Sequence, residues 1–263
     1  PCAPATGATG LGLRRTPVFA LGATLSLALP KAEARWLRAF ANGFMRLARK
    51  HRVDLVGGDT TRGPLTICVQ IMGEVPAGQA LTRDGARIGD DIWVSGFLGD
   101  AALALAAMKK RIGLKRRELA AVERRLHAPT PRITLGQALR KIANSAIDIS
   151  DGLAADLGHI CERSGVSAVI GFERLPASSV MKRYLDQPDA RAALLAGGDD
   201  YELCFTAAPA RHQAILGIAH RLSLPLTCVG TVQRAMRGAS PVTVLARDGR
   251  PMNVKHRGFD HFG

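Results

Sequence analysis

The spacing of hydrophobic and polar positions predicts strands and helices from residue 23 onward. Alternating apolar residues over 23–30 indicate a strand, and apolar residues at helical spacing between Trp36 and Leu47 indicate an amphipathic helix. Residues 57–64 are rich in glycine, threonine and aspartate and predict a loop, and a strand is expected over 65–75. The first part of the chain is therefore predicted to be strand, helix, loop and strand.

A glycine-containing connector over 76–87 precedes a longer series of mixed elements. The expected strands cover 92–95, 168–172 and 201–206, and the expected helices cover 101–110, 115–126, 133–143, 153–163 and 210–222. Gly165 is the expected helix stop, and Asp248-Gly249 is a strong hairpin signal. The pattern predicts an α+β fold with mixed sheets and flanking helices, in two domains: residues 1–80 and residues 88–263.

Charge narrows the range of partners. The 263 residues contain 36 lysines and arginines against 22 aspartates and glutamates, which gives a net charge of +14 and favours anionic partners. ATP and nucleic acid are both anionic. Only two tryptophans and two tyrosines are present, without aromatic residues interleaved among the basic ones, so nucleic-acid binding is disfavoured. The basic residues come in short groups, such as Lys115-Arg116-Arg117 and Arg124-Arg125, and a solvated helix face explains these groups equally well.

The cysteines and the amino-terminal segment give information about the cellular compartment of the protein. The five scattered cysteines form no Cys-x-x-Cys pair, so we expect buried thiols and a cytoplasmic, reducing environment. Arg14-Arg15 before the apolar residues 18–29 would also fit a twin-arginine export signal, although the alternation there favours a strand. No other run reaches the roughly 18 apolar residues of a membrane span, so no membrane partner is expected.

Carboxylates next to glycine or serine mark the candidate chemistry. Asp148 and Asp151 flank Ser150 where an apolar stretch turns into a helix. Magnesium prefers carboxylate and phosphate oxygens, and the start of a helix offers N–H donors to an anion, so a metal-bound phosphate would suit this turn. Helix capping by Ser150 or Asp151 is the structural alternative, and this segment alone does not decide between them.

Two more aspartate-bearing turns strengthen the first. Gly58-Asp59 and Gly198-Asp199 each place a carboxylate beside glycine, and each would also fit an ordinary turn. Three such turns beside core strands indicate a divalent-cation site. Neither a Gly-x-x-x-x-Gly-Lys-Ser/Thr loop nor a Gly-x-Gly-x-x-Gly pattern is present in the sequence, which disfavours P-loop ATPases and dinucleotide enzymes.

The residue order within the motifs is more specific than their chemistry. The segments that carry a family resemblance are 57–63, 95–100, 145–153, 198–203 and 258–262. In order and spacing, from about residue 23 to residue 263, they resemble the thiamine-monophosphate kinases of the aminoimidazole ribonucleotide synthetase superfamily. The resemblance implies a two-domain fold, a homodimer formed through the amino-terminal sheet, and ATP bound between the domains. It also implies magnesium-dependent conversion of thiamine monophosphate to thiamine diphosphate without a protein nucleophile.

The resemblance also assigns roles to the matching positions. It implies ATP contacts at Gly58, Asp59, Arg83 and Ser150, magnesium ligands at Asp59, Asp148 and Asp151, and thiamine contacts at Asp199 and Phe259. A surface charge is the alternative for the arginine, and a core aromatic residue is the alternative for the phenylalanine.

Residues 1–32 depart from the family pattern. The family's Gly-Asp-Asp turn, its Ser-Thr-Asp segment and its Asn-Leu-Ser-Asp segment have no match there, and Glu33 is the first acidic residue. We therefore expect residues 1–80, the dimerisation and metal side, to be incomplete, and an inactive chain is an alternative to an active kinase. The sequence also allows a superfamily enzyme with another substrate, or a non-catalytic basic domain that binds polyanions; the Asp148 segment argues against the former.

Overall fold

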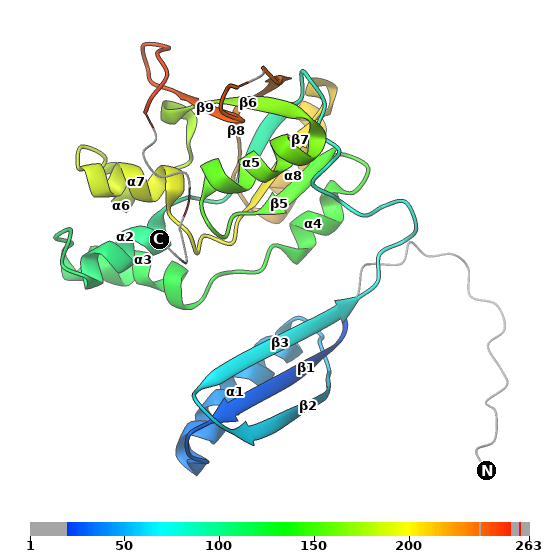
Figure 1. The fold of residues 1–263 in the computed structure, drawn as a ribbon, viewed down its shortest axis with the longest axis vertical. Coiled ribbons are helices and arrows are strands. Elements are labelled where there is room, and N and C mark those ends of the chain that lie inside the picture. Colours follow the sequence, from blue (N-terminus) through cyan, green and yellow to red (C-terminus); the bar gives the residue numbers. More distant parts are fainter. Residues whose placement is uncertain (1–19, 237, 254–257, 259–263) are drawn as a thin grey trace, which may run out of the picture. The chain divides into compact units, whose positions relative to one another are not determined.

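The chain folds into two compact units, Pro1–Ala80 and Leu81–Gly263 (Figure 1). The computed structural model describes residues 20–236, 238–253 and 258. Within these residues, none of the helices has both the length and the apolar character that crossing a membrane requires.

The first unit is a three-stranded sheet with one helix. Its elements are β1 (Ala20–Leu29), α1 (Ala34–Lys50), β2 (Leu55–Arg62) and β3 (Thr66–Gly73). The central strand β1 pairs parallel with β2 and antiparallel with β3. The strand predicted over 23–30 and the amphipathic helix after it are confirmed. In α1 the rings of Trp36, Phe40 and Phe44 stack in succession along one side of the helix.

The loop predicted over 57–64 is wrong, because residues 57–62 belong to β2. Their partners in β1 run from Thr24 to Leu29 in parallel register. Pairing with a central strand outweighs the low strand preference of glycine and aspartate, since strand preference depends strongly on context. Gly58 lies at φ 144°, and a Cβ atom there would overlap the backbone of Leu25. This glycine is therefore required by the close approach of β1, whatever ligand it meets.

The second unit is built on a six-stranded sheet of order β5-β7-β4-β8-β6-β9. Its strands are β4 (Asp91–Ser95), β5 (Ser145–Asp148), β6 (Val166–Gly171), β7 (Leu203–Ala207), β8 (Leu226–Arg234) and β9 (Val242–Leu245). Its helices are α2 (Asp100–Met108), α3 (Arg116–His127), α4 (Ile133–Leu139), α5 (Leu153–Ser164), α6 (Ser179–Lys182), α7 (Pro188–Ala196) and α8 (His212–Leu222). Neighbouring strands are antiparallel except for the β6–β9 pair.

Most predicted elements of this unit are present with shifted ends. Three expected strands correspond to β4, β6 and β7, and the expected helices correspond to α2, α3, α4, α5 and α8. Four elements, β5, β8, α6 and α7, lie where no element was predicted. Gly165 ends α5 in the left-handed conformation, at φ 66°. The Asp248-Gly249 turn is present as well, but it closes only an isolated bridge between Leu245 and Pro251.

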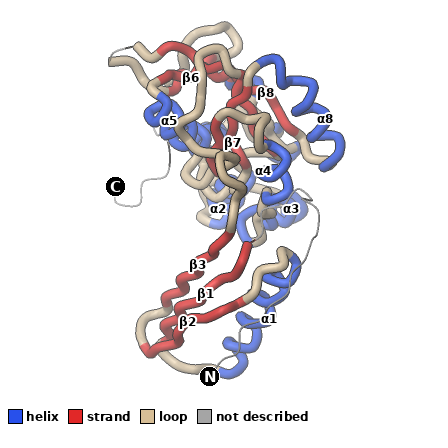
Figure 2. The backbone as a smooth tube through the Cα atoms, turned by 90° about the vertical axis from the view of Figure 1, so that its right-hand side faces the viewer, coloured by secondary structure: helices blue, strands red, loops and turns tan. Residues whose placement is uncertain are grey.

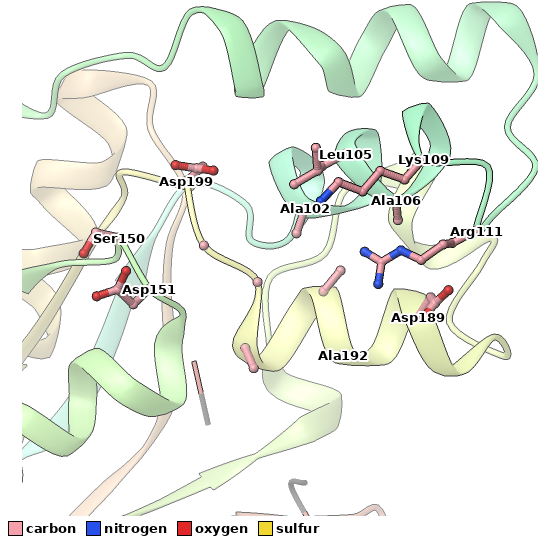
Figure 3. A pocket seen from close by; sticks show the side chains of 14 residues that line it. Ala102, Leu105, Ala106, Lys109, Arg111, Ser150, Asp151, Asp189, Ala192 and Asp199 are labelled. Carbon is pink, nitrogen blue, oxygen red and sulfur yellow. The ribbon is translucent and has the colours of Figure 1, made fainter. Parts of the chain in front are cut away.

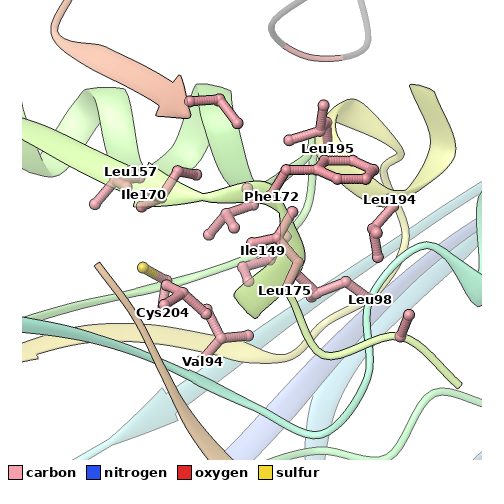
Figure 4. Close-up of a cluster of buried hydrophobic side chains, with 14 of the residues drawn as sticks. Val94, Leu98, Ile149, Leu157, Ile170, Phe172, Leu175, Leu194, Leu195 and Cys204 are labelled. Carbon is pink, nitrogen blue, oxygen red and sulfur yellow. The ribbon is translucent and has the colours of Figure 1, made fainter. Parts of the chain in front are cut away.

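Helices cover both faces of the six-stranded sheet (Figure 2). Alternation along β4 sends Trp93 to one face and Val94 to the other. Trp93 packs with Phe205 and with side chains of α4 and α8, whereas Val94 joins a larger cluster with α2, α5 and α7 (Figure 4). Both clusters are apolar and buried. Their close packing holds the strands in place, and therefore also the loops that start at the strand ends.

The thiols only partly follow the prediction that the cysteines are buried. Cys161 and Cys204 are buried, and Cys228 is half-buried. Cys68 is exposed on β3, because the whole of that strand is exposed in this chain. Cys2 lies outside the described residues.

Candidate functional site

The loop between β5 and α5 carries three of the predicted site residues. β5 ends at Asp148, Ile149 is buried, and Ser150 and Asp151 follow before α5 begins. Gly152 adopts φ 118°, and a Cβ atom there would lie 2.6 Å from the carbonyl carbon of Ala196. The tight fit against the end of α7 explains why glycine precedes the helix.

A buried carboxylate inside α5 shapes this loop. One oxygen of Asp156, Oδ2, accepts hydrogen bonds from the backbone N–H groups of Ser150, Asp151 and Gly152 at 3.0, 3.1 and 3.2 Å. Burial raises the pKa of the Asp156 carboxyl, and the hydrogen bonds from the backbone oppose that shift. The helix-capping alternative at Ser150 or Asp151 does not apply, because Gly152 is the residue before the helix and no side chain caps it.

The loop between α7 and β7 lies directly against the first loop. The N–H of Asp199 donates to the carbonyl oxygen of Ser150 at 2.9 Å, and the N–H of Tyr201 donates to that of Ile149 at 2.8 Å. A Cβ atom on Gly198 would lie 2.6 Å from the same Ser150 oxygen. Asp199 and Tyr201 both adopt left-handed φ angles, 67° and 48°, which non-glycine residues seldom do. Strained backbone of this kind is concentrated at functional sites.

These two loops form one end of a cavity of about 370 Å³ (Figure 3). Ser150, Asp151 and Asp199 line that end, and alanine side chains of α2 and α7 form the walls. Arg111 and Asp189 line the other end, and the Lys109 side chain extends from α2 toward Ala102. The cavity therefore has an acidic end, largely apolar sides and an opposite end with charges of both signs.

Tyr201 connects this cavity to Asp148. Its hydroxyl donates to Oδ1 of Asp199 at 3.2 Å. Burial raises the pKa of the Tyr201 hydroxyl, and the charges of Asp199, Asp148 and Asp151 raise it further. Carboxylates that come from two separate motifs therefore act on the pKa of one phenol, and that of Asp199 is hydrogen-bonded to it. Tyr201 and Asp148 also line a second, apolar cavity of about 470 Å³.

Two buried acidic residues anchor the loop between α7 and β7 through hydrogen bonds to other segments. Glu202 accepts hydrogen bonds from the Ser95 hydroxyl at 2.6 Å and from two nitrogens of Arg132, one of them, Nε, at 2.6 Å. Both oxygens of Asp200 accept from the N–H of Gly99, at 2.9 and 2.8 Å. Burial raises the pKa of Asp200 well above its usual value, and the neighbouring acidic residues raise it further.

The remaining predicted residues lie elsewhere. Gly58 and Asp59 are exposed on β2 in the first unit, where Oδ1 of Asp59 accepts from the N–H of Thr60 at 2.8 Å. Arg83 is exposed in the second unit, and its carbonyl oxygen accepts from the Ser164 hydroxyl. Phe259 lies outside the described residues. The second unit thus brings together four predicted residues: Asp148, Ser150, Asp151 and Asp199.

Comparison with known proteins identifies the family. The family "AIR synthase related protein, N-terminal domain" matches residues 18–75, and the corresponding C-terminal domain family matches residues 87–241. The thiamine-monophosphate kinase of Salmonella typhimurium is 42% identical over 260 residues, which is 96% of this chain and 78% of that protein. The chain belongs to the thiamine-monophosphate kinase family.

Solved structures of thiamine-monophosphate kinases share the fold. The crystal structure of the enzyme from Stenotrophomonas maltophilia K279a has a TM-score of 0.81 and 46% identity, with 89% of this chain and 73% of that chain covered. The structure of AaThiL complexed with AMPPCP and TMP has a TM-score of 0.78 and 32% identity, with 93% and 74% covered. The predicted two-domain α+β fold of the aminoimidazole ribonucleotide synthetase type is therefore confirmed.

The donor atoms at this candidate site are of the type that magnesium prefers. Asp148 and Asp151 are hard oxygen donors on one short loop, and Asp199 is close by. Among the described residues no group of three or more acidic, histidine or cysteine side chains is arranged to hold a metal ion. Magnesium usually takes one or two carboxylates together with substrate phosphates and water, so two aspartates match its normal protein share.

Sequence reasoning missed Asp156, Tyr201 and Glu202. Asp156 and Glu202 are buried. The hydrogen-bond partners of Glu202 are distant in sequence, and those of Asp156 are backbone groups of the preceding loop. A faint signal existed for Asp156, because an aspartate in the apolar first turn of a helix requires a nearby donor. No sequence signal indicates the partners of Glu202.

Proposed function

We propose that this chain transfers the γ-phosphoryl group of ATP to thiamine monophosphate, giving thiamine diphosphate. It would act as a kinase in thiamine diphosphate biosynthesis. The observation that carries the proposal is the meeting of Ser150, Asp151 and Asp199, from two motifs far apart in sequence, at the acidic end of one cavity. The relatives named thiamine-monophosphate kinase, and the complex with AMPPCP and TMP, support the same substrates. They give no support to a non-catalytic basic domain.

The roles of the residues follow from their chemistry and from the family resemblance. Asp148 and Asp151 would hold magnesium, and the hydroxyl of Ser150 would contact ATP. The carboxylate of Asp199 would accept hydrogen bonds from the thiamine moiety, with Phe259 packing on its rings. The resemblance adds Gly58, Asp59 and Arg83 as ATP contacts, with Asp59 as a further magnesium ligand.

The proposed reaction is a direct phosphoryl transfer. A phosphate oxygen of thiamine monophosphate attacks the γ-phosphorus of ATP; the new P–O bond forms as the bond to the β,γ-bridging oxygen breaks, and ADP leaves. Magnesium, when bound, would supply positive charge that neutralises the phosphates. The residues of the chain contribute by positioning the substrates, so no protein nucleophile is needed.

The same proposal includes a homodimer in the cytoplasm. β2 and β3 are the edge strands of the first sheet, and their exposed apolar side chains include Val56, Ile67 and Ile71. Exposed apolar strands of this kind suit a protein partner. Burial raises the pKa of the Cys161 thiol to about 12, and a buried, protonated thiol of this type is compatible with a reducing compartment.

The function is tested by incubating the purified chain with ATP, magnesium and thiamine monophosphate and by separating the thiamine phosphates chromatographically. We expect thiamine diphosphate and ADP in equal amounts. We expect Asp151→Asn and Asp199→Asn to lower kcat/KM by roughly 100-fold, since the first removes a proposed magnesium ligand and the second a proposed contact with the thiamine moiety.

The matched control is Asp248→Asn, which removes an exposed aspartate at the hairpin turn and should leave kcat/KM unchanged. Folding of each variant is checked by circular dichroism. Absence of product from folded wild-type chain, or equal activity in all three variants, would refute the proposal.

A further inference from the structure

The backbone donors before α5 are already occupied within the protein. The start of a helix normally offers unpaired N–H groups to a phosphate. Here the N–H groups of Ser150, Asp151 and Gly152 all point at Oδ2 of Asp156, at 3.0 to 3.2 Å. A carboxylate of the chain itself takes the place that an anionic ligand would otherwise take.

Asp156 is built into this position. Its side chain is buried, it lies in the first turn of α5, and no cap on the residue before the helix competes for the same donors. The neighbouring loop fixes the same segment from the other side, through the hydrogen bond from the Asp199 N–H to the Ser150 carbonyl oxygen. The N–H groups and a carbonyl oxygen of the loop are therefore engaged in hydrogen bonds within the protein. The loop contributes Ser150 and Asp151 to the lining of the cavity.

We infer that Asp156 is a positioning residue that occupies the backbone donors of the 150–152 loop and thereby makes nucleotide binding at this loop depend on a metal ion. The inference rests on the proposed nucleotide site. A bare triphosphate finds the N–H groups of this loop already bonded to Asp156 and meets the carboxylate of Asp151, which lines the cavity. A metal ion removes the repulsion and uses the side chains that Asp156 holds in place.

Hydrogen exchange tests the hold on the loop without any ligand. In the full chain, we expect slow amide exchange at residues 150–152. Asp156→Ala should remove this protection, whereas Asp156→Asn should largely retain it, because an amide oxygen can still accept at the same place. Unchanged protection in Asp156→Ala would overturn the inference.

Nucleotide binding tests the metal dependence. The affinity of AMPPCP is measured by calorimetry with magnesium and again with EDTA. The dissociation constant in EDTA is divided by the dissociation constant in magnesium, and this ratio is compared between proteins. In Asp156→Ala the ratio should fall at least about tenfold, the effect of one hydrogen bond to a charged group. An unchanged ratio in a folded Asp156→Ala variant would also overturn the inference.

Asp90→Asn is the matched control. Asp90 is likewise buried and accepts a backbone hydrogen bond, from Arg87 at 3.0 Å, but it makes no hydrogen bond to residues 150–152. It should change neither the exchange of residues 150–152 nor the ratio. If wild-type chain binds no AMPPCP even with magnesium, the proposed nucleotide site fails, while the exchange experiment still decides whether Asp156 holds the loop.

Discussion

At the scale of single residues, the site depends on acidic side chains whose buried positions are matched by specific donors. Asp200 accepts a hydrogen bond from the N–H of Gly99, and Asp156 accepts hydrogen bonds from three N–H groups of the 150–152 loop. Glu202 accepts hydrogen bonds from Ser95 and Arg132. An unpaired buried carboxylate is strongly unfavourable, so each of these contacts fixes one conformation of a loop. The half-buried Asp151 and Asp199, which line the cavity, thus lie on loops held by buried acidic residues that do not line it.

The pair formed by Glu202 and Arg132 gives a clear stability test. Glu202 is 1% exposed and Arg132 13% exposed, so Arg132→Ala would leave a buried carboxylate with its main partner removed. We expect a loss of about 3–5 kcal/mol in the free energy of unfolding, measured by urea denaturation. Arg250→Ala, which breaks the exposed pair with Asp248, should change it by less than about 1 kcal/mol. Equal effects of the two variants would contradict this prediction.

Asp200 gives a pH test. Because its pKa is raised in the folded state, its contribution to stability is fully present below the pKa of the unfolded chain, near 3.8. The contribution is lost as pH rises through the raised pKa. The stability of wild-type chain relative to Asp200→Asn should therefore fall as pH rises from 4 toward neutrality. Thermal unfolding of both proteins across that range measures the difference, and a constant difference would show that Asp200 does not titrate in this way.

At the scale of elements, the loops are placed by glycines that contact the backbone of another element. Gly152 touches the end of α7, Gly198 touches the 150–152 loop, and Gly58 touches β1. Any side chain at these positions would push two segments apart. Each glycine therefore determines a distance between elements as well as a local backbone angle.

Two adjacent glycines on β2 make this testable. Gly58→Ala should destabilise the first unit by about 3 kcal/mol or more, since its Cβ atom would overlap Leu25 at a positive φ. At Gly57 an added Cβ atom meets only the Thr24 side chain, at 3.8 Å, so Gly57→Ala should cost less than about 1 kcal/mol. Limited proteolysis of the first unit provides the measurement. If both variants resist proteolysis as wild-type chain does, the packing argument is wrong.

At the scale of the whole molecule, the exposed edge strand β3 determines the proposed assembly. Ile67, Val69 and Ile71 alternate along the strand and share one side of it, and Ile71 is 63% exposed. We expect Val69→Lys to shift a dimer toward monomer, measured by analytical ultracentrifugation. Leu216→Lys, at a similarly exposed position on α8, should have no effect. A wild-type chain that sediments as a monomer at all concentrations would refute the homodimer.

Local patterns in the sequence specify the individual elements and indicate the class of chemistry. Alternation over 23–30, the helical spacing after Trp36 and the stop at Gly165 depend on neighbours in the chain, and each is present in the fold. The motif around Asp148 also indicated the family, which the comparisons confirm. These features are encoded within short segments, so they need no knowledge of distant contacts.

What those segments do together depends on contacts between segments that are distant in the chain. The tertiary structure made residues 57–62 a strand, because β1 offered them hydrogen-bond partners. It brought Asp199 against Ser150, and it showed that Asp156 has already taken the donors that an anion would use. The physical reason is the same in each case: a backbone N–H group bonds to whichever acceptor folding brings near, and the sequence around it does not reveal which one that is.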